Sequence, residues 1–484
     1  MDNTKILMLG WEFPPILNGG LGIASLGLCK ALSQYAQISL ILPRANEVHQ
    51  IEKMKIYGLD EVNIKEYFEV EEQEQYTEFV KKIHYVDTEL DPYSGIVKTI
   101  PVAYEQAIQH QRTRRKTHIR YRSSTITLPP KTVEKLVPLA INPIASPDLQ
   151  NVFQVGPVYG NNLLQKVKAY TAYIDVISDS FEFDVIHAHD WMTFLAGMAL
   201  KEKTGKPLVA HIHSLQYDRS GLTQQDFITD IERRICQHAD RIITVSKYTA
   251  GKLIQEYNCD VRKIKHIHNG ISWNKKIIEK RPFPFPLVLF AGRITQQKNP
   301  LMFLRMAKQV LAAIPNVRFM MIGDGDLWQE TIEQAAVPEL IGRCIFTGQL
   351  PHEKVLEAYA SAQVYCLTSN SEPFGLTALE AAKTGIPVVL TARSGISEIL
   401  KDTPTVPINA AESMANAVVH LLQDQAYADH VVTQNFMALK NSTWGEAARK
   451  VLKLYEQVLP KQQAAPLPSV YSSSSTHKPT ANVL

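Results

Sequence analysis

The stretch Leu287-Val-Leu-Phe-Ala-Gly-Arg-Ile-Thr-Gln-Gln-Lys-Asn-Pro300 sets the fold of the second half of this chain. Its first five residues form an apolar run typical of a buried strand, and residues 292–299 indicate a loop. Asn299 and Pro300 are a favourable N-cap and first-turn pair, so a helix is expected over residues 300–314. Strand, loop and helix in this order form the repeating unit of α/β proteins.

The first half of the chain repeats this plan. Residues 6–10 predict a strand, residues 11–22 a loop rich in proline and glycine, and residues 23–35 an apolar helix. Further strands are expected over residues 184–187, 208–211, 241–245, 318–322 and 364–367. The alternation predicts an α/β protein of two Rossmann-like parallel-sheet domains that face a central cleft, with ligands bound at the carboxyl ends of the strands.

A length of 484 residues exceeds one comfortable core and favours two domains. We expect an N-terminal domain over residues 1–275, with an irregular insertion at about 47–151, and a C-terminal domain over residues 276–440. The capping-box pattern Thr443-x-x-Glu446 predicts a last helix within residues 441–460. The serine-rich residues 461–484 predict a disordered tail.

Composition excludes several classes of protein. The chain is 45% hydrophobic and 20% charged with a formal net charge of +3, which predicts no general attraction to nucleic acid or membranes. Five cysteines without Cys-x-x-Cys spacing suggest neither a zinc site nor a disulfide framework, and fit a reducing cytosol. Without a signal peptide or an apolar run of roughly 20 residues, we expect a cytoplasmic protein with no integral membrane segment. The oligomeric state stays open.

The stretch Glu372-Pro-Phe-Gly-Leu-Thr-Ala-Leu-Glu380 is the strongest functional clue. A helix is expected over residues 376–383, so its N-terminus lies behind Phe374, Gly375 and Leu376 and attracts anions. Gly375 lets a ligand approach the backbone closely, and the two carboxylates can accept hydrogen bonds from sugar hydroxyls. These features together suit a nucleotide-sugar, although a loop carboxylate followed by an ordinary helical glutamate would give the same pattern.

This stretch resembles the retaining nucleotide-sugar glycosyltransferases of family 4, which have the B-type fold, and more distantly the glycogen and starch synthases. Gly292-Arg-x-x-x-x-Lys-Asn299 and His187-Ala-His-Asp-Trp191 extend the resemblance, which covers roughly residues 5–45 and 180–460. The resemblance implies that the last helix crosses back onto the first domain, anchored by Trp444 and Tyr455.

The resemblance also assigns roles to individual residues. It implies a catalytic set of His189 at the transferred sugar, Arg293 and Lys298 on the leaving diphosphate, and Glu372 against the donor sugar. Glu380 would contact the donor ribose and Phe346 would lie near the base. The donor site would further include Phe374, Gly375 and Leu376.

Gly19 and Gly20 open the first predicted helix and suggest a second anion pocket, although such glycines often serve packing alone. The lysine that bacterial glycogen and starch synthases usually carry two residues before this pair is absent, which favours the broader family and puts ADP-glucose in doubt. His211 and His213 suit either a supporting or a core role. Asp324-Gly-Asp326 follows a strand like the family's nucleotide-side turn, and we expect no metal and no cofactor.

We therefore expect a metal-independent retaining hexosyltransferase that moves a hexose, with glucose the first candidate, from a nucleoside diphosphate to a carbohydrate acceptor such as an α-glucan. The alternatives are a lipid- or polysaccharide-directed transferase, an NAD-dependent dehydrogenase and a non-catalytic sugar-binding module. The dehydrogenase is disfavoured because the strand at residues 38–42 ends in Pro43-Arg44 rather than an acid for the ribose. A basic run over residues 112–122 indicates a solvated insertion or a contact surface for an anionic partner or the acceptor.

Overall fold

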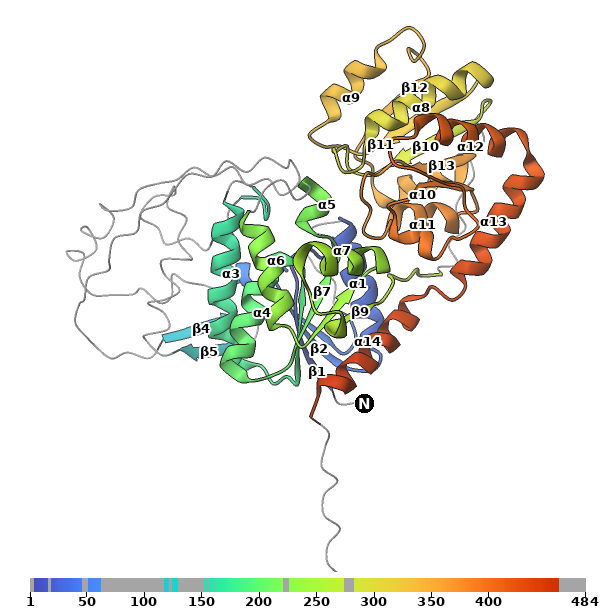
Figure 1. Ribbon diagram of the computed structural model, residues 1–484. Coiled ribbons are helices and arrows are strands. Elements are labelled where there is room, and N and C mark those ends of the chain that lie inside the picture. Colours follow the sequence, from blue (N-terminus) through green and yellow to red (C-terminus); the bar gives the residue numbers. More distant parts are fainter. Residues whose placement is uncertain are drawn as a thin grey trace, which may run out of the picture.

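The computed structural model confirms two parallel-sheet α/β domains (Figure 1). It describes residues 4–15, 19–45, 51–61, 117–121, 124–128, 152–154, 156–160, 162–220, 226–273 and 283–460. The predicted tail at 461–484 and most of the predicted insertion lie outside these residues, as does the basic run except for residues 117–121. Among the described residues, no helix has both the length and the apolar character needed to cross a bilayer.

The first domain is a seven-stranded parallel sheet in the order β3-β2-β1-β6-β7-β8-β9. Its strands are β1 Lys5–Leu9, β2 Gln37–Leu42, β3 Met54–Gly58, β6 Val185–His189, β7 Leu208–Ile212, β8 Arg241–Thr244 and β9 Ile264–His266. Its helices are α1 Gly20–Leu32, α3 Leu163–Ile177, α4 Trp191–Thr204, α5 Gln216–Ser220, α6 Phe227–His238 and α7 Lys247–Tyr257, with short 3₁₀ turns η1 Leu59–Glu61, η4 Ser178–Ser180 and η5 Val261–Lys263. A separate antiparallel hairpin joins β4 Thr117–Tyr121 and β5 Ser124–Leu128.

The second domain is a six-stranded parallel sheet in the order β12-β11-β10-β13-β14-β15. Its strands are β10 Leu287–Ala291, β11 Arg318–Ile322, β12 Cys344–Gly348, β13 Val364–Leu367, β14 Val388–Thr391 and β15 Thr405–Val406. Its helices are α8 Pro300–Ala313, α9 Trp328–Ala335, α10 His352–Ser361, α11 Leu376–Lys383, α12 Ala411–Gln423 and α13 Gln425–Leu439, with the 3₁₀ turn η6 Gly395–Glu398. The chain ends its described part in α14 Trp444–Val458.

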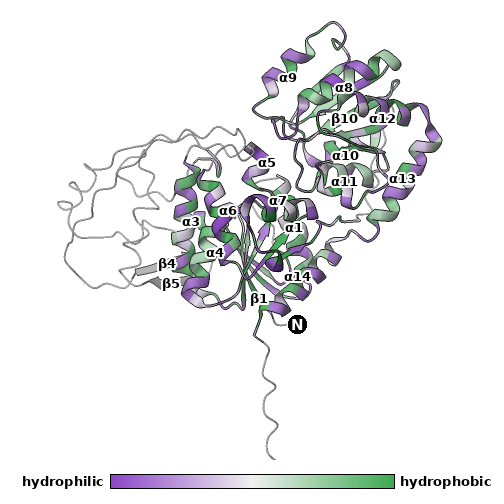
Figure 2. Cartoon of the chain, in the orientation of Figure 1, coloured by the Kyte–Doolittle hydropathy of each residue, from purple (hydrophilic) through white to green (hydrophobic). Residues whose placement is uncertain are grey.

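Local sequence explains why these elements form where they do. All five residues of β10, β6 and β7 are buried, as expected for strands covered on both faces by helices. The Asn299 side chain caps α8 by accepting a hydrogen bond from the Met302 amide at 3.2 Å, and Pro300 occupies its first turn. Figure 2 shows the apolar residues gathered in the two sheets and the polar residues on the outer faces of the helices.

The edge strand β3 was not predicted. β3 lies in the stretch that we expected to be irregular, and it pairs in parallel with β2 at the edge of the first sheet. Lys55 within it is exposed and its neighbours Ile56 and Tyr57 are only partly buried. An edge strand of mixed polarity gives neither the apolar run of a central strand nor a clean alternation, which is why the sequence pattern did not indicate it.

Each sheet has a point at which the order of its strands changes direction. In the first sheet this point lies between β1 and β6, and in the second between β10 and β13. In open parallel sheets, the loops that leave the carboxyl ends of the two strands at such a point diverge and leave room for a ligand. The loops after these four strands contain Gly19, His189 at the end of β6, Lys298 and Glu372, so the topology brings together the predicted residues of each domain.

The last helix returns to the first domain. α14 packs against α1 in the same core as β1, with Trp444, Ala448, Val451 and Tyr455 buried there (Figure 1). A Cβ at Gly27 of α1 would lie only 2.2 Å from the Trp444 ring, so a glycine at this position is what lets the ring lie flat against α1.

Truncating Trp444 tests how much this contact stabilises the protein. We expect Trp444→Ala to lower the free energy of unfolding by about 3–5 kcal/mol, because it removes a large side chain that is only 8% exposed. Urea denaturation measures the loss. Trp273, which is 43% exposed, supplies the control: Trp273→Ala should cost less than about 1 kcal/mol, and equal losses in the two variants would contradict the packing described.

Candidate active site

A buried ion pair lies at the switch point of the second domain. Lys298 Nζ donates to Glu372 Oε2 at 2.5 Å, and the Ser369 hydroxyl donates to the same oxygen at 2.7 Å. The two side chains are 16% and 8% exposed. The sequence predicted that both residues serve one site, and the structure places them in direct contact. An ammonium has three N–H donors and Glu372 accepts one of them, so the others can be offered to an anionic ligand.

The loops that carry this pair are fixed to each other. Gln297 accepts a hydrogen bond through its carbonyl from the Asn370 amide at 2.8 Å, and its side chain donates to the Ser371 carbonyl at 3.0 Å. Asn299 donates to the Asn370 side chain at 3.0 Å. The Lys298–Glu372 pair is therefore held by main-chain and side-chain contacts on both sides rather than by its charges alone.

The predicted nucleotide-side turn packs directly on the loop of Arg293. A Cβ at Gly323 would lie 1.9 Å from the Gly292 carbonyl oxygen, and one at Gly325 would lie 2.4 Å from that of Ile294. The Ile294 amide donates to the Asp324 carbonyl at 2.9 Å. These two glycines are needed because the backbones approach too closely for any side chain. Arg293 itself is exposed at the start of the loop.

The helix after Glu372 begins where the sequence predicted. Gly375 is the N-cap of α11 with φ at +107°, and no side chain caps this end. The Phe374 ring is buried in the core of the second domain, at 3% exposure, so any contribution of Phe374 to a ligand site would come from its main chain. Leu376 reaches across to the first domain, where its Cδ1 lies 3.9 Å from the position of a Cβ on Gly20. The N-termini of α1 and α11 therefore face each other across the domain boundary.

The N-terminus of α1 already holds a carboxylate of the protein. Glu12 Oε2 accepts a hydrogen bond from the Gly22 amide at 3.2 Å, and Tyr159 donates its hydroxyl to Glu12 Oε1. A Cβ at Gly19 would lie 2.5 Å from Glu12 Oε2, so a glycine is required there for the carboxylate to fit. The anion pocket at Gly19 and Gly20 stays a prediction, and Glu12 would share this helix end with any anion that binds there. Sequence reasoning did not single out Glu12.

Four histidines stack at the carboxyl ends of β6 and β7. His187 and His189 lie parallel, with ring centroids 4.6 Å apart, and His211 and His213 continue the stack. His189 Nδ1 lies 2.9 Å from His213 Nε2, and His187 Nε2 lies 3.2 Å from His211 Nδ1. Burial lowers the pKa of His189 to about 3 and the pKa values of the other three well below their usual range. All four rings are therefore neutral at physiological pH.

His189 is positioned to offer a nitrogen to a ligand. It is 1% exposed, and its Nε2 has no hydrogen-bond partner among the described residues. A buried polar atom without a partner costs free energy, which a ligand hydroxyl would recover. On the other side of the stack, His187 Nδ1 is hydrogen-bonded to the hydroxyl of Tyr455 in α14, so the returning helix helps to fix the rings.

The same histidines suggest a metal site by proximity, because ligand nitrogens of His187, His189 and His211 lie within 4.8 Å of one another. The ring orientations do not suit it. A metal ion binds in the plane of an imidazole at about 2 Å from the nitrogen. The rings of His187 and His189 are 3° from parallel and stacked, so one ion cannot lie in both planes. The expectation of a metal-independent enzyme stays a prediction.

Asp190 holds the turn after His189 in an unusual backbone conformation. Its φ of 57° and ψ of 172° belong to a region that residues other than glycine rarely adopt, at a cost of about 1–3 kcal/mol. Its carboxylate accepts a hydrogen bond from the His213 amide at 2.7 Å, which ties the loops after β6 and β7 together. Burial raises the pKa of Asp190 to about 7, although the hydrogen bond from the His213 amide acts to lower it.

The first domain grips the loop that carries Glu372. Ser246, at the start of α7, donates its hydroxyl to the Pro373 carbonyl at 2.6 Å. Ser371 shares a 2.8 Å hydrogen bond with the Tyr248 hydroxyl and donates to Asp218 of α5 at 2.5 Å. Both flanks of Glu372 are thus positioned by side chains that come from the other domain.

A carboxylate of the second domain caps α7. Glu398 accepts hydrogen bonds from the Lys247 and Tyr248 amides at 2.9 and 2.8 Å, and lies 2.7 Å from His268 Nε2. Burial alone would raise the pKa of Glu398, but the hydrogen bonds from His268 and the two amides lower it overall. A negative charge at a helix N-terminus is stabilised by the helix dipole, so this contact favours closely apposed domains.

Two further predicted residues lie at the margins of this site. Glu380 stands on the second turn of α11, with Oε1 4.0 Å from His352 Nε2. Burial raises its pKa to about 7, and nearby Lys383 opposes the shift. Phe346 lies on the edge strand β12, partly buried, with its ring nearly perpendicular to that of Trp328. The assigned roles of these residues, and of the other predicted site residues, stay predictions.

Comparison with protein families identifies the class. Residues 139–274 match the family described as Glycosyltransferase Family 4, and residues 273–451 match the family described as Glycosyl transferases group 1. The two matches meet at residues 273–274 and together cover most of the second domain and the part of the first domain that follows residue 138. Both matches are to glycosyltransferase families, which confirms the resemblance drawn from the sequence motifs.

Several curated proteins are similar over part of their length. An uncharacterised glycosyltransferase of Methanocaldococcus jannaschii is 29% identical over 57% of this chain and 75% of its own. A D-inositol 3-phosphate glycosyltransferase of Mycobacteroides abscessus is 26% identical over 63% of this chain and 74% of its own. A glycogen synthase of Mycobacterium tuberculosis is 28% identical over 51% of this chain and 62% of its own.

A solved structure shares the fold. The sucrose-phosphate synthase of Thermosynechococcus elongatus superposes with a TM-score of 0.59, covering 94% of this chain and 98% of its own, at 18% sequence identity. This likeness confirms the B-type arrangement of two Rossmann-like domains.

Removing the Glu398 carboxylate tests the contact between the domains. We expect Glu398→Ala to leave the α7 amides without their partner, at a cost of about 1.5–3 kcal/mol for hydrogen bonds to a charged group, and to increase the radius of gyration as the domains separate more often. Small-angle X-ray scattering measures the change. Glu456→Ala, at an exposed position of α14, is the matched control. An unchanged radius of gyration in Glu398→Ala would show that the contact between Glu398 and α7 does not hold the domains together.

Proposed function

We propose that this protein transfers a hexose, with glucose the first candidate, from a nucleoside diphosphate to an acceptor hydroxyl with retention of configuration at the anomeric carbon. The observation that carries the proposal is the Lys298–Glu372 pair beside the uncapped N-terminus of α11, opposite the N-terminus of α1. A lysine and bare helix amides suit a diphosphate, and carboxylates suit the hydroxyls of the attached sugar.

The proposed mechanism depends on where negative charge develops during sugar transfer. When the bond between the anomeric carbon and the phosphate breaks, negative charge grows on the leaving diphosphate. Lys298 and Arg293 are the cations assigned to that charge, assisted by the α11 amides, and such preorganised groups lower the barrier most when water is excluded. The leaving phosphate can accept the proton of an acceptor hydroxyl that attacks from the same face. In this proposal Glu372 binds sugar hydroxyls and is not a covalent nucleophile.

The histidine stack supplies the first-domain side of the proposed site. His189 is neutral, so its Nε2 can exchange a hydrogen bond with a sugar hydroxyl without bringing a positive charge next to the carbon that becomes cationic. Asp190 and the stacked rings fix its orientation. The unpartnered Nε2 supports a polar ligand group at this place.

The acceptor is proposed from relatives and needs a direct test. The names of two relatives point to a phosphorylated inositol and to a growing glucan. We retain the α-glucan as first candidate because Trp11-Glu-Phe-Pro-Pro15 and His187-Ala-His-Asp-Trp191 resemble segments of the glycogen and starch synthases. A panel of UDP-, ADP- and GDP-sugars with glucan primers, inositol phosphates or water as acceptor, followed by mass spectrometry, identifies the pair. Absence of transfer and of sugar release with every donor would overturn the proposal.

The role of Lys298 in turnover can be measured separately from its role in stability. Lys298→Met should lower kcat by about 10²–10³-fold, because it removes a charge that stabilises the leaving group. It also leaves Glu372 buried without its partner, which can cost about 3–5 kcal/mol of stability. The double variant Lys298→Met/Glu372→Gln removes both charges, so its unfolding midpoint should recover while its turnover does not. Recovery of turnover together with the midpoint would mean that Lys298 acts only on folding.

Glu380 predicts a pH dependence of donor binding. Ribose hydroxyls donate to a carboxylate and favour its charged form, so donor binding should lower the pKa of Glu380 from about 7. By linkage, affinity should weaken by up to about tenfold per pH unit as the pH falls below about 7, and level off above it. Titration calorimetry with an intact nucleotide-sugar measures the profile. Glu380→Gln should bind more weakly with a flat profile; a flat wild-type profile would contradict this assignment.

A further inference from the structure

A buried arginine lies in the short helix α5. Arg219 belongs to the part of the first domain that contacts the second domain (Figure 1). Its side chain is 5% exposed. Its Nε donates to Gln216 Oε1 at 2.9 Å and its Nη1 donates to Ser214 Oγ at 2.7 Å. Because a guanidinium stays charged at physiological pH, these directed hydrogen bonds hold a permanent positive charge inside the protein.

One set of hydrogen bonds leads from Arg219 to His189. Ser214, whose hydroxyl accepts from Arg219, directs its amide at Asp190 Oδ1 at 3.4 Å. The neighbouring His213 amide donates to the same oxygen at 2.7 Å. Asp190 directly follows His189, in a backbone conformation that persists only when its surroundings hold it. A shift of Ser214 would therefore be passed through Asp190 to the His189 ring.

A second set of hydrogen bonds leads to the loop of Glu372. Asp218 precedes Arg219 in α5, and its Oδ2 accepts from the Leu215 amide at 2.8 Å. Its Oδ1 accepts from the Ser371 hydroxyl of the second domain at 2.5 Å. Ser371 is the residue before Glu372, so α5 must keep its orientation for this carboxylate to hold the loop.

Helices α6 and α7 hold α5 on its other side. Glu232 of α6 accepts from the Gln216 amide at 2.9 Å through Oε1 and at 3.1 Å through Oε2. Its Oε1 also lies 3.5 Å from Arg219 Nη2, in an ion pair whose acid side chain is 1% exposed. Tyr257 of α7 accepts from the Tyr217 amide through its hydroxyl at 3.3 Å. A helix of five residues is too short to be stable alone, so these contacts determine where α5 lies.

Three buried carboxyl groups share the charge of Arg219. Burial raises the pKa of each of these groups, which are Asp190, Asp218 and Glu232. The positive charge of Arg219 acts to lower all three. An ionised carboxylate only accepts hydrogen bonds, as the contacts described above require, whereas a protonated one also donates. Removing the cation would therefore weaken both sets of hydrogen bonds.

We propose that Arg219 is a positioning residue that fixes two groups of the proposed site at once. It orients His189 through the contacts of Asp190, and it orients the loop of Glu372 through the contacts of Asp218. The inference rests on the proposed function for the roles of His189 and Glu372, and Arg219 itself touches no substrate in it. One side chain thereby sets the first-domain and second-domain sides of the sugar site relative to each other.

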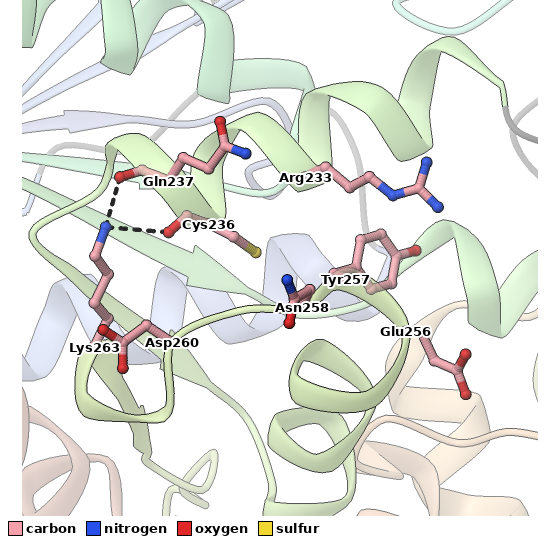
Figure 3. Close-up of a pocket in the computed structure, with 8 residues that line it drawn as sticks. All are labelled: Arg233, Cys236, Gln237, Glu256, Tyr257, Asn258, Asp260 and Lys263. Atoms are coloured by element: carbon pink, nitrogen blue, oxygen red, sulfur yellow. Dashed lines mark hydrogen bonds between the residues drawn. The ribbon is translucent and has the colours of Figure 1, made fainter.

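A second arginine supplies a matched control. Arg233 follows Glu232 in α6 but lines a separate cavity of about 430 Å³ between α6 and the end of α7 (Figure 3). Gln237, Glu256 and Lys263 line the same cavity. Arg233→Met therefore removes the same charge from the neighbourhood of Glu232 and leaves the hydrogen bonds of Arg219 in place.

Hydrogen exchange of the full-length protein tests the positioning role without a substrate. In Arg219→Met, the amides of His213 and Glu372 should exchange about tenfold faster than in the wild type, which matches the loss of one hydrogen bond to a charged group. Arg233→Met should match the wild type at both amides. Faster exchange confined to α5, with both amides unchanged, would overturn the proposal.

A second variant keeps this test decisive if Arg219→Met does not fold. Arg219→Met/Glu232→Gln removes both charges of the buried pair, so neither is left uncompensated. The same two amides should exchange faster in it, and wild-type rates at both would equally overturn the proposal.

Turnover tests the link to the proposed function. With a nucleotide-sugar that the wild type consumes, Arg219→Met should lower kcat by about 10–100-fold, because small displacements of reacting groups are costly. Arg219→Lys, which keeps the charge, should restore part of the loss, and Arg233→Met should behave as the wild type. Asp218→Ala combined with Arg219→Met should be little slower than Arg219→Met alone, because both changes break the same contact.

The outcomes separate this inference from the proposed function. Wild-type kcat in Arg219→Met, or losses that multiply in the double variant with Asp218→Ala, would overturn the role of Arg219 while the wild-type enzyme remains active. A wild type that consumes no nucleotide-sugar would overturn the proposed function, and the exchange rates at His213 and Glu372 would still decide whether Arg219 positions the two groups.

Discussion

The ion pair between Lys298 and Glu372 is the interaction on which the proposed chemistry depends. Each partner lies in a loop that leaves the carboxyl end of a central strand of the second sheet, and the two loops are joined by hydrogen bonds from Gln297 and Asn299. Removing either charge alone leaves the other uncompensated in a nearly buried place. The pair therefore fixes both loops before a ligand arrives, and places a cation and a carboxylate beside the amides that begin α11.

The first domain completes this arrangement through polar side chains that reach the loop of Glu372. Ser246 and Tyr248 of the α7 start and Asp218 of α5 position the residues on either side of Glu372, while Glu398 caps α7 in return. The same domain contributes neutral, stacked histidines with an unpartnered nitrogen on His189. Short polar contacts of this kind can break and form again when two domains move relative to each other.

The features that the sequence predicted correctly are those that depend on residues close together in the chain. The bounds of β10, β11, β13 and α11 agree with the predictions, because apolar runs and the glycine at residue 375 act within a few residues. Glu12 was missed because its hydrogen bond is to the amide of Gly22, ten residues later in the chain. The hydrogen bond between the Tyr248 amide and Glu398 joins residues that are 150 apart in sequence. The histidine stack depends on the pairing of His189 in β6 with His211 in β7. Such long-range contacts leave no periodic trace in a single sequence.

The proposed function requires that a diphosphate and its sugar bind at the Lys298–Glu372 pair. The most direct measurement is a crystal structure of the protein with a non-hydrolysable nucleotide-sugar. We predict diphosphate oxygens within hydrogen-bond distance of Lys298 and the α11 amides, and sugar hydroxyls on Glu372. A nucleotide-sugar bound elsewhere, with the Lys298–Glu372 pair unchanged and its surroundings filled only by water, would contradict the account.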